Sequence, residues 1–210
     1  PDAKIPGRAK VDSYPVQEKY GYIFVFLGDL PEDQRPPIMD VQGLDDDAWA
    51  TTYQSLEADI YYQRSIENSL DCTHNDYVHE DQHVDDTARG ARDIIIYDEE
   101  NTDWVTFFRT KIPVKGRSSG SFQQEAQDNI FHGVVDMGQH CISNFWTYIE
   151  LGPDMKLLQH FFETPIDETH TRLFFVMMRN FMRNSEGDEM AITLNNYVLG
   201  QDIDTLFWVR

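Results

Sequence analysis

The stretch SIENSLDCTHNDYVHEDQH, residues 65–83, combines three histidines with several carboxylate and amide side chains. Imidazole and carboxylate groups are the ligands that non-haem Fe(II) sites use, commonly as two histidines and one carboxylate on one face of the ion. Thiolate ligands would instead favour zinc or an iron–sulfur cluster. This composition raises the hypothesis of a mononuclear iron site. The simpler alternative is a solvated acidic segment with incidental histidines.

The spacing of the first two histidines restricts how they could share one ion. On a regular helix His74 and His79 would point roughly 140° apart, because each residue turns about 100°. The helix must therefore end or distort near His74, and Asn75–Asp76 is the expected place. Asn68, Asp71 and His74 recur every three residues and share one helix face if the helix extends that far. Asp71 could then hydrogen-bond near His74, as carboxylates often do beside histidine ligands.

A carboxylate ligand must come from elsewhere, and the segment YVLGQDIDTLFW offers Asp202 and Asp204. In a predicted helix the two point roughly 200° apart, so only one can face the ion. Val198 lies four residues before Asp202 and Leu206 four residues after it, which places Asp202 on an apolar stripe that should face the core. A cation would compensate a carboxylate buried there. The other histidines are expected to be structural or surface residues: His83, His132, His140, His160 and His170.

Hydrophobic periodicity predicts the elements that must position these residues. Strands are expected at 20–28, 48–60, 92–100, 103–114, 131–138, 140–152, 156–166 and, after a turn, within 167–181. Helices are expected at 61–70 and 189–210, the second weakened in its middle by Gly200. Strands, one helix, many strands and one helix indicate an α+β domain with a large antiparallel sheet.

Composition limits the partners. The 210 residues are 40% hydrophobic and 13% aromatic, which favours a packed domain, and the formal charge of −20 disfavours nucleic acid and anionic membranes. The sequence has two cysteines, and so few indicate no disulfide framework, consistent with a cytoplasmic protein. The sequence shows neither an apolar run near the roughly 20 residues of a membrane span nor a signal peptide at its start. Since it lacks an initial Met, we expect a piece of a longer protein.

The stretch SIENSLDCTHNDYVH resembles the mononuclear-iron motif of the Rieske non-haem iron oxygenases, a family of ring-hydroxylating dioxygenases, monooxygenases and demethylases. Their pattern is Glu-Asn, two or three residues, Asp, two residues, His, four residues, His. The matching residues are Glu67, Asn68, Asp71, His74 and His79. In addition, YPVQEKYGYIFVFLGD (14–29) is similar to the close of the family's Rieske domain, and NNYVLGQDIDTLFW to the segment that supplies the carboxylate ligand.

This resemblance implies a role for each matching residue. His74, His79 and Asp202 would hold the iron. Asp71 would correspond to the carboxylate that links a histidine on iron to a cluster histidine of the neighbouring subunit, and Asn68 to the asparagine near the iron. The implied fold is a large antiparallel sheet wrapped around a helix, called helix-grip-like, over a long pocket. The implied assembly is a homotrimer.

One departure from the family concerns the Rieske [2Fe-2S] cluster, whose ligands are a Cys-x-His and a Cys-x-x-His pair. The sequence lacks the full set, because Cys72 belongs to the iron motif and no histidine follows Cys141 closely. We therefore expect the remnant of a Rieske domain at 1–29, a linker at 30–47, and a mononuclear-iron catalytic domain at 48–210 that is incomplete at its C-terminus. The cluster itself would belong to the full-length chain.

The implied reaction is an O2-dependent hydroxylation, dihydroxylation or oxidative demethylation of an organic, aromatic or cyclic substrate. An NAD(P)H-dependent reductase or a ferredoxin would supply electrons through the cluster. Candidates for the substrate pocket, each more simply explained as core, are Phe145, Trp146, Phe161, Phe174 and Phe175. The alternative from another class is a helix-grip ligand-binding module without catalysis.

Overall fold

The computed structural model describes residues 6–79, 95–115, 130–152 and 154–208. The chain divides into two compact units, Pro1–Val41 and Gln42–Arg210. None of the described helices has an apolar run long enough to cross a membrane.

The first unit contains a β-hairpin where a single strand at 20–28 was expected, so that expectation is wrong. Strands β1 (Val16–Lys19) and β2 (Tyr22–Val25) pair antiparallel. Tyr20 and Gly21 join them with positive φ values of 59° and 77°, the backbone of a tight two-residue hairpin turn. The short 3-10 helix η1 (Glu32–Gln34) follows.

The second unit is built on a seven-stranded antiparallel sheet in the order β3-β9-β8-β7-β6-β5-β4. Its strands are β3 (Ala50–Ala58), β4 (Ile95–Asn101), β5 (Val105–Lys115), β6 (Ile130–His140), β7 (Asn144–Gly152), β8 (Met155–Pro165) and β9 (Thr171–Arg179). Consecutive strands from β4 to β9 pair with each other, and β3 closes the sheet beside β9. The expected α+β fold with a large antiparallel sheet is confirmed.

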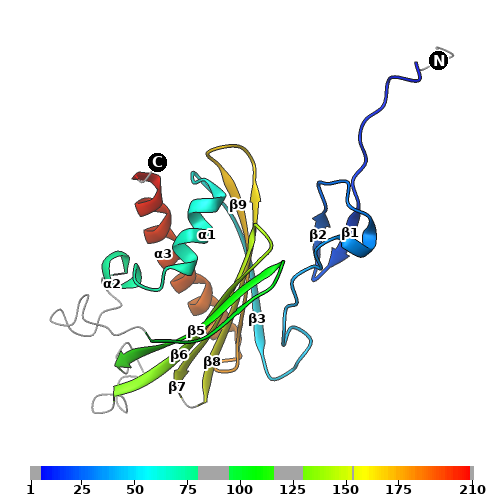
Figure 1. Cartoon of the computed structure of the whole chain (residues 1–210). Helices are drawn as coiled ribbons and strands as arrows, with labels where there is room; N and C mark the ends of the chain where they lie inside the picture. The colour runs from blue at the N-terminus through cyan, green and yellow to red at the C-terminus, as the bar shows by residue number, and fades with distance from the viewer. Residues whose placement is uncertain (1–5, 80–94, 116–129, 153, 209–210) are drawn as a thin grey trace. The chain divides into compact units, whose positions relative to one another are not determined.

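Three helices lie together on one face of this curved sheet (Figure 1). They are α1 (Tyr62–Leu70), α2 (Asn75–Val78) and α3 (Ser185–Trp208). The helix expected at 61–70 is α1. The helix expected at 189–210 is α3, which begins four residues earlier and continues through Gly200 without a break.

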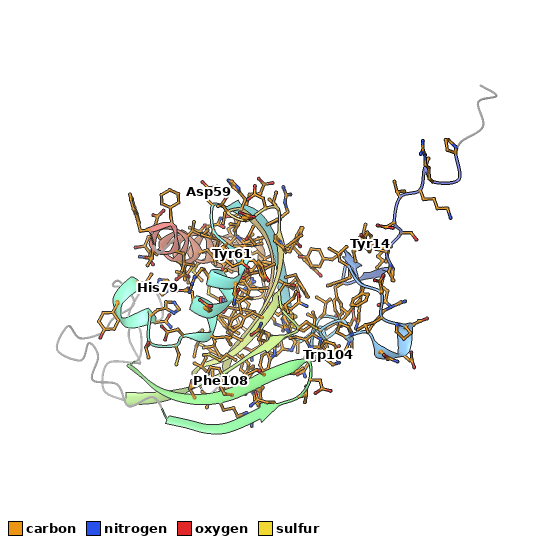
Figure 2. The ribbon with its side chains drawn as sticks, turned by 45° about the horizontal axis from the view of Figure 1, so that its top comes forward. Tyr14, Asp59, Tyr61, His79, Trp104 and Phe108 are labelled. Atoms are coloured by element: carbon orange, nitrogen blue, oxygen red, sulfur yellow. The ribbon has the colours of Figure 1, made fainter. Side chains whose placement is uncertain are left out.

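The main apolar cluster fills the space between helices and sheet, where side chains crowd together (Figure 2). Its buried members are Ile66, Met137, Phe145, Phe161, Phe175, Met177 and Ala191. Three of the five aromatic pocket candidates therefore face the helices. Trp146 and Phe174 point to the other side, because successive side chains of a strand alternate between its faces.

Close contact between α3 and the sheet determines how the helix is rotated. The buried residues of α3 are Gly187, Ala191 and Asn195, which recur every four residues and present a narrow, mostly small face to the sheet. Asn195 Nδ2 donates a hydrogen bond to Gln54 Oε1 (2.8 Å), and Gln54 Nε2 donates to Asn196 Oδ1 (2.7 Å). These bonds anchor α3 on β3, and so determine where its later residues point.

Candidate metal centre

The connection between α1 and α2 separates the two motif histidines from a continuous helix. The predicted break exists, but it lies at residues 71–74 and not at Asn75–Asp76, which fall inside α2. Asp71 causes it locally: its Oδ1 accepts a hydrogen bond from the main-chain N–H of Thr73 (2.8 Å). An aspartate that bonds the main chain two residues on favours a turn over a helix. His74 and His79 then flank the single turn of α2 as its two caps.

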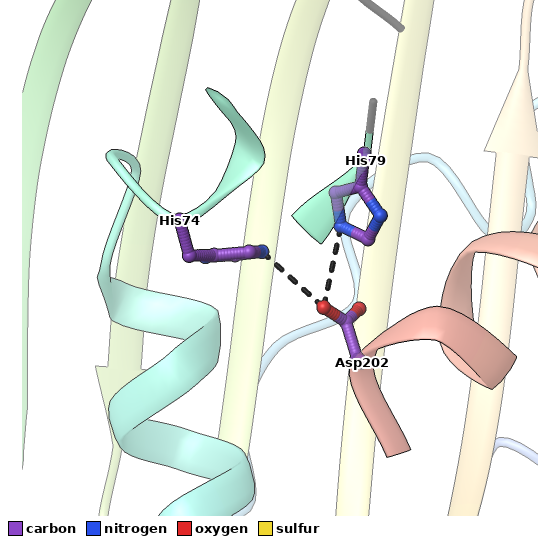
Figure 3. A group of neighbouring side chains, drawn as sticks. All are labelled: His74, His79 and Asp202. Atoms are coloured by element: carbon purple, nitrogen blue, oxygen red, sulfur yellow. Dashed lines mark ion pairs between the residues drawn. The ribbon is translucent and has the colours of Figure 1, made fainter. Parts of the chain in front are cut away.

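His74, His79 and Asp202 converge from α2 and α3, and we call them the metal cluster (Figure 3). The Nε2 atoms of His74 and His79 lie 3.4 and 3.2 Å from Asp202 Oδ1. One ligand atom from each residue lies within 4.8 Å of the other two. The three side chains are only 14%, 2% and 15% exposed, respectively. They form the one such group of three or more potential ligands among the described residues.

The outer nitrogens of both rings have acceptors. His74 Nδ1 hydrogen-bonds to the main-chain oxygen of Asp71, and His79 Nδ1 lies 2.9 Å from Gln201 Oε1. A carbonyl oxygen only accepts, so each Nδ1 carries the hydrogen. In a neutral imidazole this leaves the lone pair on Nε2. Histidine ligands of metals are usually oriented in this way by a hydrogen bond at the other nitrogen.

The largely buried carboxylate of Asp202 is stabilised by positive charge nearby. Burial raises the pKa of Asp202, but hydrogen bonds and charge from His74 and His79 outweigh burial and lower the pKa to about 2. Asn68 Nδ2 donates a further hydrogen bond to Asp202 Oδ1 (3.1 Å). Those hydrogen bonds from Nε2 require protonated imidazolium rings. When the rings are neutral and their Nε2 atoms carry lone pairs, the lone pairs and the carboxylate repel each other unless a cation lies between them. The donor set of two imidazoles and one carboxylate fits a non-haem Fe(II) ion.

Of the other predicted site residues, one contacts the metal cluster through its side chain and two have exposed side chains. Asn68 touches Asp202 directly. Asp71 contacts His74 through its main-chain oxygen, whereas its side chain is exposed and bonded to Thr73. Asp204 is exposed, as its position opposite Asp202 on the helix predicted.

The remaining histidines lie apart from the metal cluster wherever the structure describes them. His140 and His160 are buried, and His170 is exposed. His132 belongs to β6, but its side chain is outside the described part of the chain, as is the whole of His83. Their expected structural or surface role stays a prediction.

Gln201 and Tyr197 are members of the site that the sequence analysis did not assign. Gln201 accepts from His79, and its Nε2 donates to Tyr197 Oη (3.1 Å). A weak signal was present, because Gln201 adjoins Asp202 and lies four residues after Tyr197 in a predicted helix. The sequence does not reveal the direction of the His79 ring. Only that direction shows that Gln201 contacts a candidate ligand.

A family model described as Vanillate O-demethylase oxygenase C-terminal domain matches residues 58–206, a range that includes the metal cluster. The vanillate O-demethylase oxygenase subunit of Pseudomonas sp. is 32% identical over 79 residues, which cover 38% of this chain and 22% of that protein. The toluene-4-sulfonate monooxygenase system iron-sulfur subunit of Comamonas testosteroni is 26% identical over 106 residues, covering 50% and 30%. Both matches span less than a third of the curated relative.

Solved structures share the fold. NdmB of Pseudomonas putida CBB5 superposes with a TM-score of 0.76 at 20% identity, covering 99% of this chain and 55% of that one. Dicamba monooxygenase bound to 3,6-dichlorosalicylic acid superposes with a TM-score of 0.75 at 21% identity, covering 100% and 63%. The sheet and helices described above therefore have the fold of the matching parts of these two proteins, and this chain spans somewhat more than half the length of each.

Proposed function

Because the chain belongs to the vanillate O-demethylase oxygenase C-terminal domain family, within the Rieske non-haem iron oxygenases, we propose that it holds one Fe(II) ion through His74, His79 and Asp202. The observation that carries this proposal is the convergence of two Nε2 atoms and one carboxylate oxygen while both Nδ1 atoms are already bonded. Bound Fe(II) would supply the activation of O2. The protein residues supply position, charge and exclusion of water.

Each side chain around the ion has a defined task in this proposal. Asp202 contributes one negative charge, and Asn68 holds its carboxylate in place with one hydrogen bond. Gln201 keeps the His79 ring turned so that Nε2 faces the ion. The packed apolar cluster below, which contains Phe145 and Phe161, excludes water from this side of the site.

The proposed reaction is the oxidation of an aromatic substrate by hydroxylation or oxidative demethylation. The relatives support this class, because their names describe a vanillate O-demethylase and a toluene-4-sulfonate monooxygenase. Inserting one oxygen atom of O2 consumes two electrons and two protons and releases the other atom as water. An NAD(P)H-dependent reductase or ferredoxin would provide the electrons through a Rieske [2Fe-2S] cluster of the full-length protein.

Asp71 is the proposed connection between that cluster and the iron. Its main-chain oxygen bonds the ring of His74 while its carboxylate is at the surface, where a neighbouring subunit of a homotrimer could reach it. A non-catalytic ligand-binding module, the alternative from the sequence, offers no reason for three ligand atoms to converge.

A zinc hydrolase has one observation in its favour that the sequence analysis did not use. Residues 79–83, HEDQH, have the His-Glu-x-x-His spacing of zinc hydrolases, which carry both histidines on one helix. Here α2 ends at Val78, and His79 faces His74 and Asp202 instead. Glu80 and His83 are outside the described residues. The family match therefore supports iron over zinc.

Metal analysis of two matched variants tests the proposal. Asp202→Ala should reduce bound Fe(II) from about one ion per chain to near zero, because it removes one of three ligands. Asp204→Ala, two residues along the same helix but exposed, should keep full occupancy and activity. The reverse ranking, or tight stoichiometric zinc in place of iron in protein prepared with both metals, contradicts the proposed function.

A further inference from the structure

Two consecutive hydrogen bonds lead from His79 to the protein surface. His79 Nδ1 donates to Gln201 Oε1 (2.9 Å), and Gln201 Nε2 donates to Tyr197 Oη (3.1 Å). A single amide group therefore separates a proposed iron ligand from a phenol. The side chain of His79 is 2% exposed, whereas Tyr197 is 48% exposed. We call these two hydrogen bonds the surface path, because they connect the buried side of the metal cluster with solvent.

The surface path belongs to the same helix as the third proposed ligand. Gln201 directly precedes Asp202, and Tyr197 lies four residues before Gln201 on α3, which makes their side chains neighbours on the helix surface. Tyr77 of α2 is a useful comparison, because it is 64% exposed and lies two residues before His79. Among the described residues, no hydrogen bond joins the phenol of Tyr77 to the metal cluster.

Side chains that an oxidant would damage lie in and against the apolar cluster below the site. Met137 and Met177 are buried members of that cluster, and Cys72, two residues before His74, packs against it. Oxidation turns methionine into a polar sulfoxide, which disrupts a packed core, and takes cysteine to acids that are largely irreversible. An oxidant formed at the proposed iron without a substrate would therefore damage its own surroundings, unless an electron reached it by another route.

A tyrosine can supply such an electron. The O–H bond of the Tyr197 phenol would break, its electron would pass through Gln201 and His79 to the oxidised site, and its proton would pass to water beside this exposed residue. With peroxide as the oxidant, Fe(II), H2O2 and tyrosine give Fe(III), hydroxide, water and a tyrosyl radical. A thiol then returns a hydrogen atom to the radical and restores tyrosine, and two of the resulting thiyl radicals join as a disulfide.

We propose that Tyr197 is a one-electron donor that protects the iron site through the surface path when no substrate is bound. This protective redox function adds to the proposed oxygenase function and rests on it. Gln201 has two tasks in this scheme, because the amide that orients His79 also connects that ligand with Tyr197. Tyr197 itself contacts none of the three proposed ligands through the surface path, so iron binding should not depend on its hydroxyl group.

Electron paramagnetic resonance after rapid freezing tests this proposal. Protein loaded with equimolar Fe(II), desalted and free of aromatic substrate, is mixed with H2O2. The wild type should show a tyrosyl radical, whose spectrum narrows when the tyrosine rings are deuterated. Tyr197→Phe should lose this signal, whereas Tyr77→Phe should keep it in full. Both variants should bind iron like the wild type, because water can accept from Gln201 Nε2 in place of the phenol.

Peptide mass spectrometry gives a second readout. After repeated additions of H2O2, Tyr197→Phe should contain more sulfoxide at Met137 and Met177 than the wild type, because the protecting electron is missing. Tyr77→Phe should match the wild type at both methionines. Asp202→Ala, which should bind no iron, controls for radicals formed away from the site and should show no tyrosyl signal.

The results separate this proposal from the proposed function. A radical of equal size in Tyr197→Phe, or an equal loss in the two phenylalanine variants, overturns the role of Tyr197. The second of these results would indicate a freely diffusing oxidant, which attacks the more exposed Tyr77 as readily. Iron content of the same samples is measured separately. Wild-type protein without iron contradicts the proposed oxygenase, whereas iron-replete wild-type protein without a radical contradicts only the protective function.

Discussion

Two groups of histidine and aspartate in this molecule have the same chemistry and opposite surroundings. One is the metal cluster. The other, which we call the surface cluster, consists of Asp59, Asp167 and His170. Side chains of the metal cluster are at most 15% exposed, whereas those of the surface cluster are 47–65% exposed.

The pKa of aspartate does not distinguish the two groups. The pKa of Asp167 is lowered to about 2, chiefly by a hydrogen bond from the main-chain N–H of Thr169 and then by one from His170. Asp202 reaches the same value by a different route. What differs is the make-up and the burial of the two groups. In the metal cluster two imidazole Nε2 atoms face one carboxylate, that of Asp202, whereas in the surface cluster one imidazole, His170, lies between two carboxylates, at 2.8 and 3.5 Å. The metal cluster is thus distinguished by its burial and by its two converging imidazoles, and the pKa of its aspartate does not set it apart.

Removing one histidine from each cluster should give the largest contrast. His79→Ala should lose essentially all of about one bound Fe(II) per chain, since two remaining donors form no facial site. His170→Ala should retain it. Iron analysis after gel filtration measures both, with circular dichroism to confirm folding. Equal iron content in the two variants would mean that the buried cluster is not the site.

Changing the group behind a ligand should give an intermediate effect. Gln201→Leu should weaken Fe(II) binding about 10- to 100-fold, because His79 loses the acceptor that orients it. Gln201→Glu, which still accepts at that position, should restore most of the affinity. Asp167→Asn is the matched change in the surface cluster and should have no effect. Competition with a chelator gives the affinities, and an unaffected Gln201→Leu variant would remove Gln201 from the site.

Glu163 is a third case beside the two clusters. Its carboxyl group is buried, and its hydrogen-bond partner is Ser65, not a histidine. Its folded-state pKa of about 8 exceeds the ordinary 4.5, so its contribution to stability is complete below pH 4.5 and is lost as pH rises toward 8. Between pH 4.5 and 8 the unfolding free energy of the wild type should therefore fall by up to about 1.4 kcal/mol per pH unit because of this group. Glu163→Gln should lack this contribution to the fall. Denaturant titrations at several pH values test this. Glu57→Gln, at the surface beside Arg172, is the control and should decline like the wild type.

The smallest effect is expected at the surface cluster itself. Asp167→Asn should lower the melting temperature by less than about 2 °C at pH 7, because solvent screens an exposed carboxylate. Since the pKa is lowered from 3.8, even this contribution should vanish as pH falls toward 2. Thermal unfolding at pH 7 and pH 2.5 measures it. A large fall in melting temperature at pH 7 would show that the turn around Asp167 stabilises the rest of the domain as well as its own loop.

The resemblance to the family motif supplied His74, His79 and Asp202 as the candidate ligands, and an apolar stripe along the helix favoured Asp202 over Asp204. The structure brings the three residues together. The hairpin at Tyr20 was missed, because a tyrosine with positive φ has no signature in composition. Gln201 was missed for another reason. Its partner His79 lies 122 positions away in the chain, and only the folded arrangement of α2 and α3 brings the two side chains together.

Strand β3 pairs with the last strand of the sheet, and this arrangement sets the order in which a nascent chain can mature. Strands β4 to β9 each pair with a sequence neighbour and can form as they leave the ribosome, whereas Ala58 must wait for Thr171. Asn68 and Asp202 are 134 positions apart, so the last contacts of the centre arise only after α3 has been synthesised. A metal ion bound by all three proposed ligands could therefore not guide early folding. Its uptake would instead follow the pairing of β3 with β9 and the synthesis of α3.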